Sequence, residues 1–170
     1  MTKIIMILAP ERYQEQEYGD PRRVFEEEGF TVKTTSTVKV AQGKLGGKTT
    51  VDLLLQDVQV NDFDAIVFVG GPGAFVYFED EVALNLARAF EKEGKWVTAI
   101  CAGPGILANA GVLKGKRATS WPGEGDHLKE KGATYTNAAV EQDGKIITAN
   151  GPLAAEAFGQ TIVAAMKEGK

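Results

Sequence analysis

The stretch WVTAICAGPGILA, residues 96–108, places an apolar run directly before a cysteine and several small residues. Trp96 to Ile100 is typical of a buried strand, and Gly103 to about Ala110 is typical of a helix, which leaves Cys101 at the turn between them. A strand that passes straight into a helix is the repeating unit of parallel sheets covered by helices. The stretch therefore predicts an α/β protein.

The rest of the chain continues this alternation of strands and helices. We expect strands at 3–8, 31–35, 65–70 and 117–120, a hairpin at 140–149 around Asp143-Gly144, and helices from Asp20-Pro21 to Gly29 and at 80–93, 125–131 and 154–166. Residues 38–50 are expected to form an exposed, hairpin-like excursion at a sheet edge. Together these elements predict a flavodoxin-like, doubly wound and mostly parallel sheet with helices on both faces.

Composition narrows the possible classes of protein. The length of 170 residues suits one domain over 1–170, and no repeat or linker divides it. The net charge of −4, with basic residues scattered among acidic ones, weighs against a nucleic-acid partner. The first apolar run stops at Pro10, and no run approaches the roughly 20 residues of a membrane span. We therefore expect a cytoplasmic protein with no membrane partner, in which the single cysteine is a free thiol.

Cys101 has two readings on local sequence. At a helix N-terminus, free N–H groups and the helix dipole favour an anion, which predicts a lowered thiol pKa and a nucleophilic thiolate. Ligands of parallel sheets also bind beyond the carboxyl ends of the strands, where this turn is expected. The alternative is a buried cysteine that serves as a small hydrophobic residue.

Two other segments offer groups that could complete a site. The turn Gly70-Gly71-Pro72-Gly73 follows a second apolar strand, so its amides could face a developing oxyanion, although glycine-rich turns are common. The loop after the first strand carries Glu11, Glu15 and Glu17, any of which could share a proton with Cys101 or be surface charge.

Taken together, the segments resemble the ThiJ/PfpI superfamily, also called the DJ-one superfamily, whose fold is like that of class I glutamine amidotransferases. The residues that carry the resemblance are EYGDP (17–21), DAIVFVGGPGA (64–74), AICAGPGILANAGVLKGKRAT (99–119), VEQDGKIITANGP (140–152) and the final helix. The resemblance implies that Cys101 is the nucleophile and that Glu17 hydrogen-bonds it. It also implies that Gly70, Gly71 and Ala102 supply the oxyanion amides.

The sequence departs from the family pattern at its histidines. PfpI-type peptidases have histidine directly after the cysteine, where this chain has Ala102, and the human branch has a histidine where this chain has Trp121. The one histidine, His127, lies in a short helix-like stretch, DHLKEKG, which favours a surface or structural role over a catalytic one. Phe75 and Val76 occupy the region where PfpI-type oligomers contribute an acidic residue. These departures weaken the hypothesis that the protein is a PfpI-type peptidase.

The leading functional hypothesis is glyoxalase- or deglycase-like detoxification of an α-oxoaldehyde or glycated small molecule, which would make this a stress protein that needs no cofactor or metal. The alternatives are a redox sensor with an oxidisable Cys101, a chaperone-like role, and a PfpI-type peptidase. The resemblance also implies a homodimer or higher homo-oligomer. The aromatic residues Phe75, Tyr77 and Phe78 could line its interface, cover the site or belong to the core.

Overall fold

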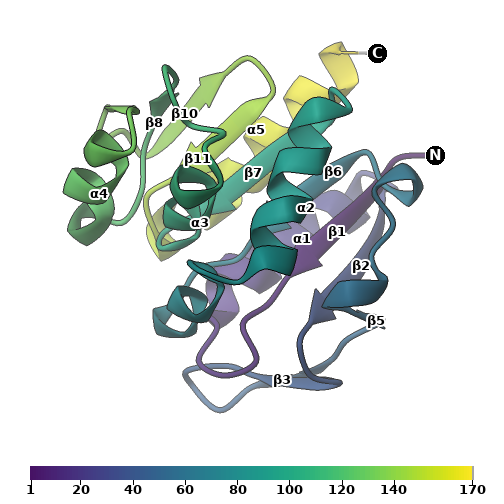
Figure 1. Ribbon diagram of the computed structural model, residues 1–170. Coiled ribbons are helices and arrows are strands. Elements are labelled where there is room, and N and C mark those ends of the chain that lie inside the picture. The colour runs from purple at the N-terminus through teal and green to yellow at the C-terminus, as the bar shows by residue number, and fades with distance from the viewer. Residues whose placement is uncertain (170) are drawn as a thin grey trace.

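A seven-stranded sheet runs through the middle of the protein in the order β10-β11-β7-β6-β1-β2-β5 (Figure 1), in a computed structural model that describes residues 1–169. Its strands are β1 (Lys3–Ile7), β2 (Thr31–Ser36), β5 (Leu53–Leu54), β6 (Ala65–Phe68), β7 (Trp96–Ile100), β10 (Val140–Asp143) and β11 (Ile146–Ala149). Every neighbouring pair is parallel apart from the β10–β11 hairpin. The predicted mostly parallel sheet is confirmed, and β2-β1-β6-β7-β11 has the flavodoxin-like order 2-1-3-4-5.

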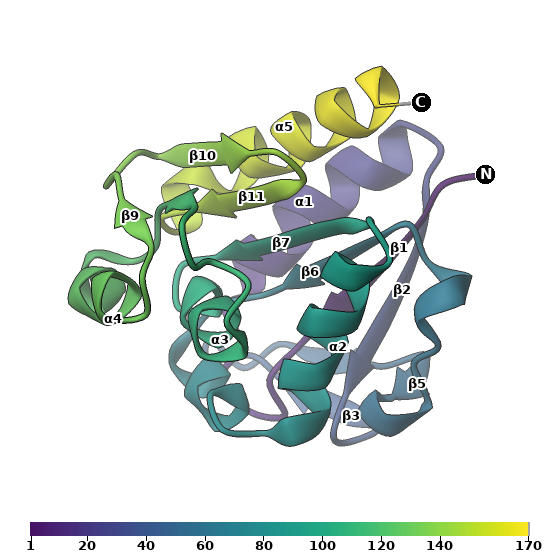
Figure 2. The same cartoon turned by 45° about the horizontal axis from the view of Figure 1, so that its top comes forward.

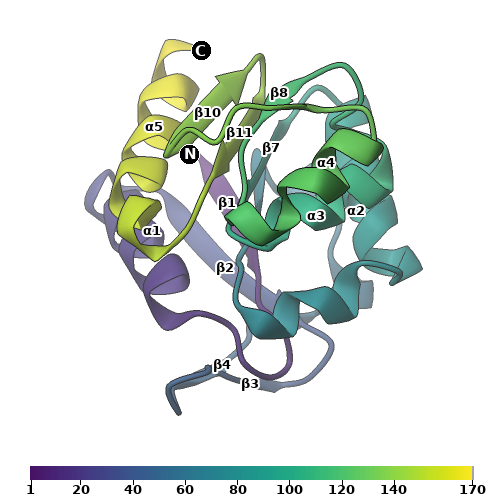
Figure 3. The ribbon, with the colours of Figure 1, turned by 90° about the vertical axis from the view of Figure 1, so that its left-hand side faces the viewer.

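Helices cover both faces of the sheet, as the sequence predicted. Helices α1 (Glu15–Glu27) and α5 (Ala155–Glu168) pack together on one face, and α2 (Glu81–Lys92) and α3 (Gly103–Ala110) lie on the other (Figure 2). Figure 3 shows the short α4 (Gly125–Glu130) beside α3. The central strands are buried on both faces, which explains their continuous apolar sequences. Within residues 1–169, no helix has the length and apolar character to span a membrane.

Helix α1 begins earlier than its proline signal predicted. The sequence indicated a start at Asp20-Pro21, but the helix begins at Glu15 because the side chain of Gln14 accepts the backbone N–H of Glu17 at 2.8 Å and caps the first turn. Pro21 then lies inside the helix, where it lacks the N–H that would bond the Glu17 carbonyl. The early start places Glu17 in the first turn of α1.

The excursion at 38–50 forms a small sheet of its own instead of the predicted sheet edge. Its strands β3 (Val40–Gln42) and β4 (Lys48–Thr50) are antiparallel, and the two-residue β5 takes the edge beside β2. A second small sheet pairs β8 (Arg117–Ala118) with β9 (Thr134–Tyr135). Strands as short as β5 and β9 carry too few residues for a periodic sequence signal, which is why they were missed.

The aromatic residues after the glycine turn divide between the core and the surface. They lie in and just after a 3-10 helix, Pro72–Tyr77. Tyr77 is buried, and its hydroxyl donates to the Leu8 carbonyl at 2.7 Å, whereas Phe75 is exposed. Tyr77 therefore belongs to the core, whereas Phe75 is exposed and packs its ring against that of Phe78.

Candidate active site

Cys101 lies on a sharp turn between the end of β7 and the start of α3. Its backbone has a φ of 63°, a left-handed conformation that costs a residue with a Cβ atom about 1–2 kcal/mol. Two hydrogen bonds hold the turn: the Cys101 N–H donates to the Ala149 carbonyl at 2.9 Å, and the Trp121 N–H donates to the Cys101 carbonyl at 2.8 Å. The fold thus maintains a strained turn that presents the thiol, as functional sites often do.

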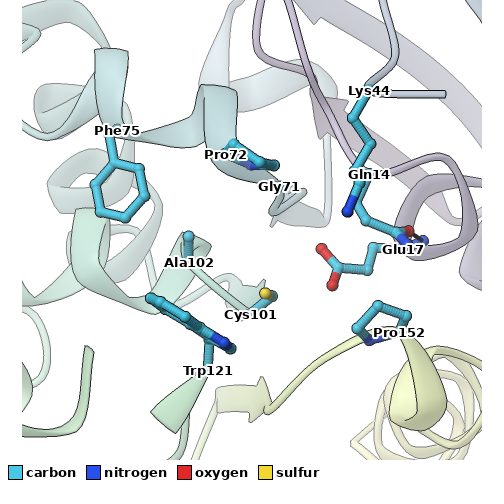
Figure 4. A pocket seen from close by; sticks show the side chains of 10 residues that line it. All are labelled: Gln14, Glu17, Lys44, Gly71, Pro72, Phe75, Cys101, Ala102, Trp121 and Pro152. Carbon is cyan, nitrogen blue, oxygen red and sulfur yellow. Dashed lines mark hydrogen bonds between the residues drawn. The ribbon is translucent and has the colours of Figure 1, made fainter. Parts of the chain in front are cut away.

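The thiol opens into a pocket of about 330 Å³ at the carboxyl ends of the central strands (Figure 4). Ligands of open parallel sheets bind in this position. The lining comes from the loop before α1, α1 itself, the β3–β4 turn, the glycine turn, the Cys101 turn and the loops that precede α4 and α5. The lining residues are Gln14, Glu17, Lys44, Gly71, Pro72, Phe75, Cys101, Ala102, Trp121 and Pro152.

Glu17 points toward Cys101 from the opposite wall of this pocket (Figure 4). The residue is fully buried, and neither carboxyl oxygen has a hydrogen-bond partner of good geometry. Burial raises the pKa of Glu17 to about 7, because the charged form loses its hydration, while the nearby thiol, Lys44 and the Gly70 amide oppose that rise. Glu17 can therefore gain or lose a proton near neutral pH, as a general acid–base group must.

The predicted lowering of the thiol pKa is wrong. Burial raises the pKa of Cys101 to about 12, and the negative charge of Glu17 adds to the rise, since a second anion beside it is unfavourable. The amides of Gly71 and Ala102 lower the pKa, but they do not outweigh these two effects. The resting thiol is protonated, so a nucleophilic sulfur requires a base that removes its proton during attack.

The predicted oxyanion amides separate into two groups. The N–H groups of Gly71 and Ala102 face the sulfur, whereas that of Gly70 faces Glu17. A Cβ atom at Gly70 would stand only 2.4 Å from a Glu17 carboxyl oxygen and 2.5 Å from the Ile100 carbonyl oxygen. Glycine at position 70 therefore allows the end of β6, the Glu17 carboxyl group and the Cys101 turn to pack closely together.

The other two carboxylates of the first loop lie outside the pocket lining. Glu11 is exposed. Glu15 accepts the N–H groups of Leu45 at 2.9 Å and Gly47 at 3.0 Å, so it fixes the β3–β4 turn against α1. That turn carries Lys44, which lines the pocket together with Gln14. Neither residue was predicted from the sequence, because no local pattern connects residue 44 with the turn at Cys101.

Neither His127 nor Trp121, which stands where the human branch has a histidine, provides an acid–base group in the pocket. The Nε2 atom of His127 lies 2.8 Å from the Asn109 amide oxygen, and its ring stacks on Phe78, so it does not line the pocket. Trp121 lines the pocket with its side chain, which has no proton to exchange near neutral pH. Among residues 1–169, no cluster of three or more His, Cys, Asp and Glu side chains is arranged to hold a metal ion.

These features define an α/β protein with a cysteine elbow and a buried glutamate. The sequence model of the DJ-1/PfpI family matches residues 2–165, and the chain belongs to this family. An uncharacterized protein of Methanocaldococcus jannaschii is 39% identical over 98% of this chain and 83% of its own length. A deglycase of Pyrococcus abyssi is 36% identical over 87% of this chain and 90% of its own.

Comparison with solved structures gives the same family over nearly the whole chain. A crystal structure of a ThiJ/PfpI domain protein from Brachyspira murdochii superimposes with a TM-score of 0.95. It is 34% identical and covers 98% of this chain and 96% of its own. The fold and the family resemblance predicted from the sequence are therefore confirmed.

Proposed function

We propose that the protein is a cofactor-independent enzyme that detoxifies α-oxoaldehydes or their adducts, with Cys101 as nucleophile and Glu17 as acid–base group. The observation that carries the proposal is the buried Glu17 carboxyl group, which points at the thiol, has no hydrogen bond of good geometry and has a pKa raised to about 7. Similarity to a named deglycase supports the same class of reaction.

The first step forms a hemithioacetal. The Cys101 sulfur bonds to the aldehyde carbon as its proton passes to the Glu17 carboxylate, and the C=O π electrons move to oxygen. The amides of Gly71 and Ala102, which face the sulfur, stabilise the resulting oxyanion before it is protonated. Because Glu17 accepts the proton during attack, the high thiol pKa does not prevent the reaction.

Glu17 first passes the thiol proton to the hemithioacetal oxyanion, which restores its carboxylate. The carboxylate then removes the hydrogen from the former aldehyde carbon to give an enediolate and returns that proton to the neighbouring carbon. The hydroxyl proton of the hemithioacetal moves to the neighbouring oxygen, and a thioester remains on Cys101. Water hydrolyses the thioester and restores the thiol. For methylglyoxal the sum is addition of one water to give lactate.

The decisive experiment follows methylglyoxal loss and lactate formation in a buffer free of amines and thiols, since both react with aldehydes. Cys101→Ser and Glu17→Gln should abolish lactate formation, whereas the control His127→Gln, outside the pocket, should retain it. Equal rates for wild type and Cys101→Ser would refute the proposal. Loss of lactate formation in His127→Gln as well would mean that the loss in the Cys101 and Glu17 variants is not specific to the pocket.

A second candidate is selective oxidation of Cys101, favoured by the same contact. When protonated, Glu17 can donate a hydrogen bond to a sulfinate formed on the sulfur by two equivalents of peroxide. Intact-mass analysis after graded peroxide should then show two added oxygens on the single cysteine before any of the three methionines oxidises. Unselective oxidation would exclude this role.

Self-association also remains a proposal. A homo-oligomer is expected from the family resemblance, and exposed apolar side chains, including Phe75, Val76 and Leu153, are available at the surface of the chain. Sedimentation velocity over a range of concentrations would test it, and a monomer at every concentration would contradict it.

A further inference from the structure

The pocket wall beside Glu17 carries a second charged side chain that the proposed reaction does not use. Lys44 extends from the β3–β4 turn toward Glu17 (Figure 4). Among the described residues that line the pocket it is the one cation, and no ion pair between described residues includes it. Its positive charge already lowers the pKa of Glu17, and it is not neutralised in an ion pair, so it can also attract an anion that enters the pocket.

The turn that carries Lys44 is held in place from both sides. The Lys44 N–H donates to the Tyr13 carbonyl at 2.8 Å, and Glu15 accepts the N–H groups of the next residue and of Gly47. Gly43 N–H closes the turn on the Gly47 carbonyl at 2.7 Å. The lysine backbone is thus fixed over the pocket, although its side chain is exposed.

The size of the pocket also exceeds what a small neutral aldehyde needs. A volume of about 330 Å³ lies at the lower end of the range for pockets that hold drug-sized ligands. Methylglyoxal has only five non-hydrogen atoms and is much smaller than such ligands. A larger substrate can place its carbonyl group at Cys101 and a second group near Lys44.

We propose that Lys44 determines specificity by binding an anionic group of the substrate, a carboxylate or a phosphate, while the carbonyl carbon lies at Cys101. The reaction in which such a substrate is consumed rests on the proposed function, but the charge preference at the thiol does not. An anionic electrophile should therefore reach Cys101 more readily than a neutral one of equal size.

Iodoacetate and iodoacetamide provide a matched pair, since both alkylate the sulfur with loss of iodide and differ in one charge. The measurement is the ratio of their rates at Cys101, followed by intact mass. Lys44→Gln should lower the iodoacetate/iodoacetamide ratio about fivefold, as expected for one partly exposed charge pair. Lys44→Arg should preserve the ratio, because it keeps the charge.

Lys48→Gln is the matched control, because it removes the same charge from the same hairpin outside the pocket lining. Glu15→Ala tests the positioning of the turn, and it should lower the ratio while the iodoacetamide rate stays constant. An unchanged ratio in Lys44→Gln, or an equal fall in Lys48→Gln, would overturn the proposal.

Two pairs of substrates test whether the anionic group that Lys44 binds is a phosphate or a carboxylate. Hydroxypyruvaldehyde phosphate is compared with hydroxypyruvaldehyde, and 4,5-dioxopentanoate with its methyl ester. Because Lys44 also acts on the pKa of Glu17, Lys44→Gln can change kcat/KM for both members of a pair, but it should lower the anionic/neutral ratio of kcat/KM about fivefold for the preferred pair. A Lys44-dependent alkylation ratio without turnover of any oxoaldehyde would refute the proposed function alone, whereas turnover with no Lys44 effect would refute the anion site alone.

Discussion

Glu17 faces Cys101 across the pocket, and both of its carboxyl oxygens are buried without a hydrogen bond of good geometry. Since the pKa of Cys101 is raised to about 12 and that of Glu17 to about 7, the carboxylate is the base available to the thiol near neutral pH. This pairing supports the proposal that Cys101, a partly buried and protonated thiol, acts as a nucleophile.

The first prediction concerns the pH dependence of Cys101 reactivity. The rate of iodoacetamide alkylation should rise with pH through about 7 as Glu17 ionises and becomes able to accept the thiol proton. In Glu17→Gln this step should disappear, leaving only the rise due to direct ionisation of the thiol. Intact mass across a pH series measures both profiles. A step near pH 7 that survives in Glu17→Gln would assign the titration to another group.

The second prediction concerns stability. Glu17 binds its proton more tightly in the folded than in the unfolded protein, because burial raises its pKa from 4.5 to about 7. Ionisation of Glu17 therefore destabilises the fold as pH rises from about 4.5 to about 7, and the loss persists above that range. Glu17→Gln cannot ionise. Between pH 5 and pH 8 its free energy of unfolding should gain roughly 2 kcal/mol relative to wild type.

Chemical denaturation at several pH values measures this difference. The protonated glutamate and the glutamine have similar shapes, so the two proteins should differ least at the acidic end. A constant difference across the series would mean that Glu17 does not titrate in this range.

The third prediction concerns the strained turn. Because Cys101 has a positive φ, Cys101→Gly should be more stable than Cys101→Ala by about 1 kcal/mol, although both lack the thiol. Ala164→Gly on the exposed face of α5 is the control, since glycine in a helix should instead cost about 1 kcal/mol. Equal stability of the two Cys101 variants would show that the turn carries no strain.

Local sequence was sufficient to predict the two turns of the site, which follow β6 and β7. The apolar runs at β6 and β7 and the small residues after them predicted both turns, since sharp turns need glycine or alanine wherever they occur. The choice of Glu17 among three carboxylates required the family resemblance. Its place in α1 depends on the Gln14 cap, which the proline signal obscured.

The remaining features depend on tertiary contacts. Lys44 reaches the pocket because Glu15 binds a turn thirty positions further along the chain, and no sequence period encodes such a contact. The direction of the thiol pKa was mispredicted because the helix N-terminus is a local feature, whereas burial and the Glu17 charge come from packing. Sequence therefore located the cysteine turn but not the electrostatics around it.

The last prediction compares two glycines that differ in the space around them. Gly70→Ala would bring a Cβ atom within 2.5 Å of the Ile100 carbonyl oxygen and 2.7 Å of the Cys101 Cβ atom. The strand end and the turn must then separate, which should cost about 1–3 kcal/mol of stability. Displacement of Glu17 or Cys101 should lower the proposed activity on the order of a hundredfold.

Gly19→Ala is the matched control, since it makes the same change on α1 where no atom lies within 4 Å of the new Cβ. Alanine favours a helix over glycine, so Gly19→Ala should stabilise the protein by about 0.5–1 kcal/mol and leave Cys101 alkylation unchanged. Thermal unfolding and the iodoacetamide rate of the two variants measure both effects. If Gly70→Ala kept wild-type stability and thiol reactivity, the close approach of Gly70, Glu17 and Cys101 would not be required for the site.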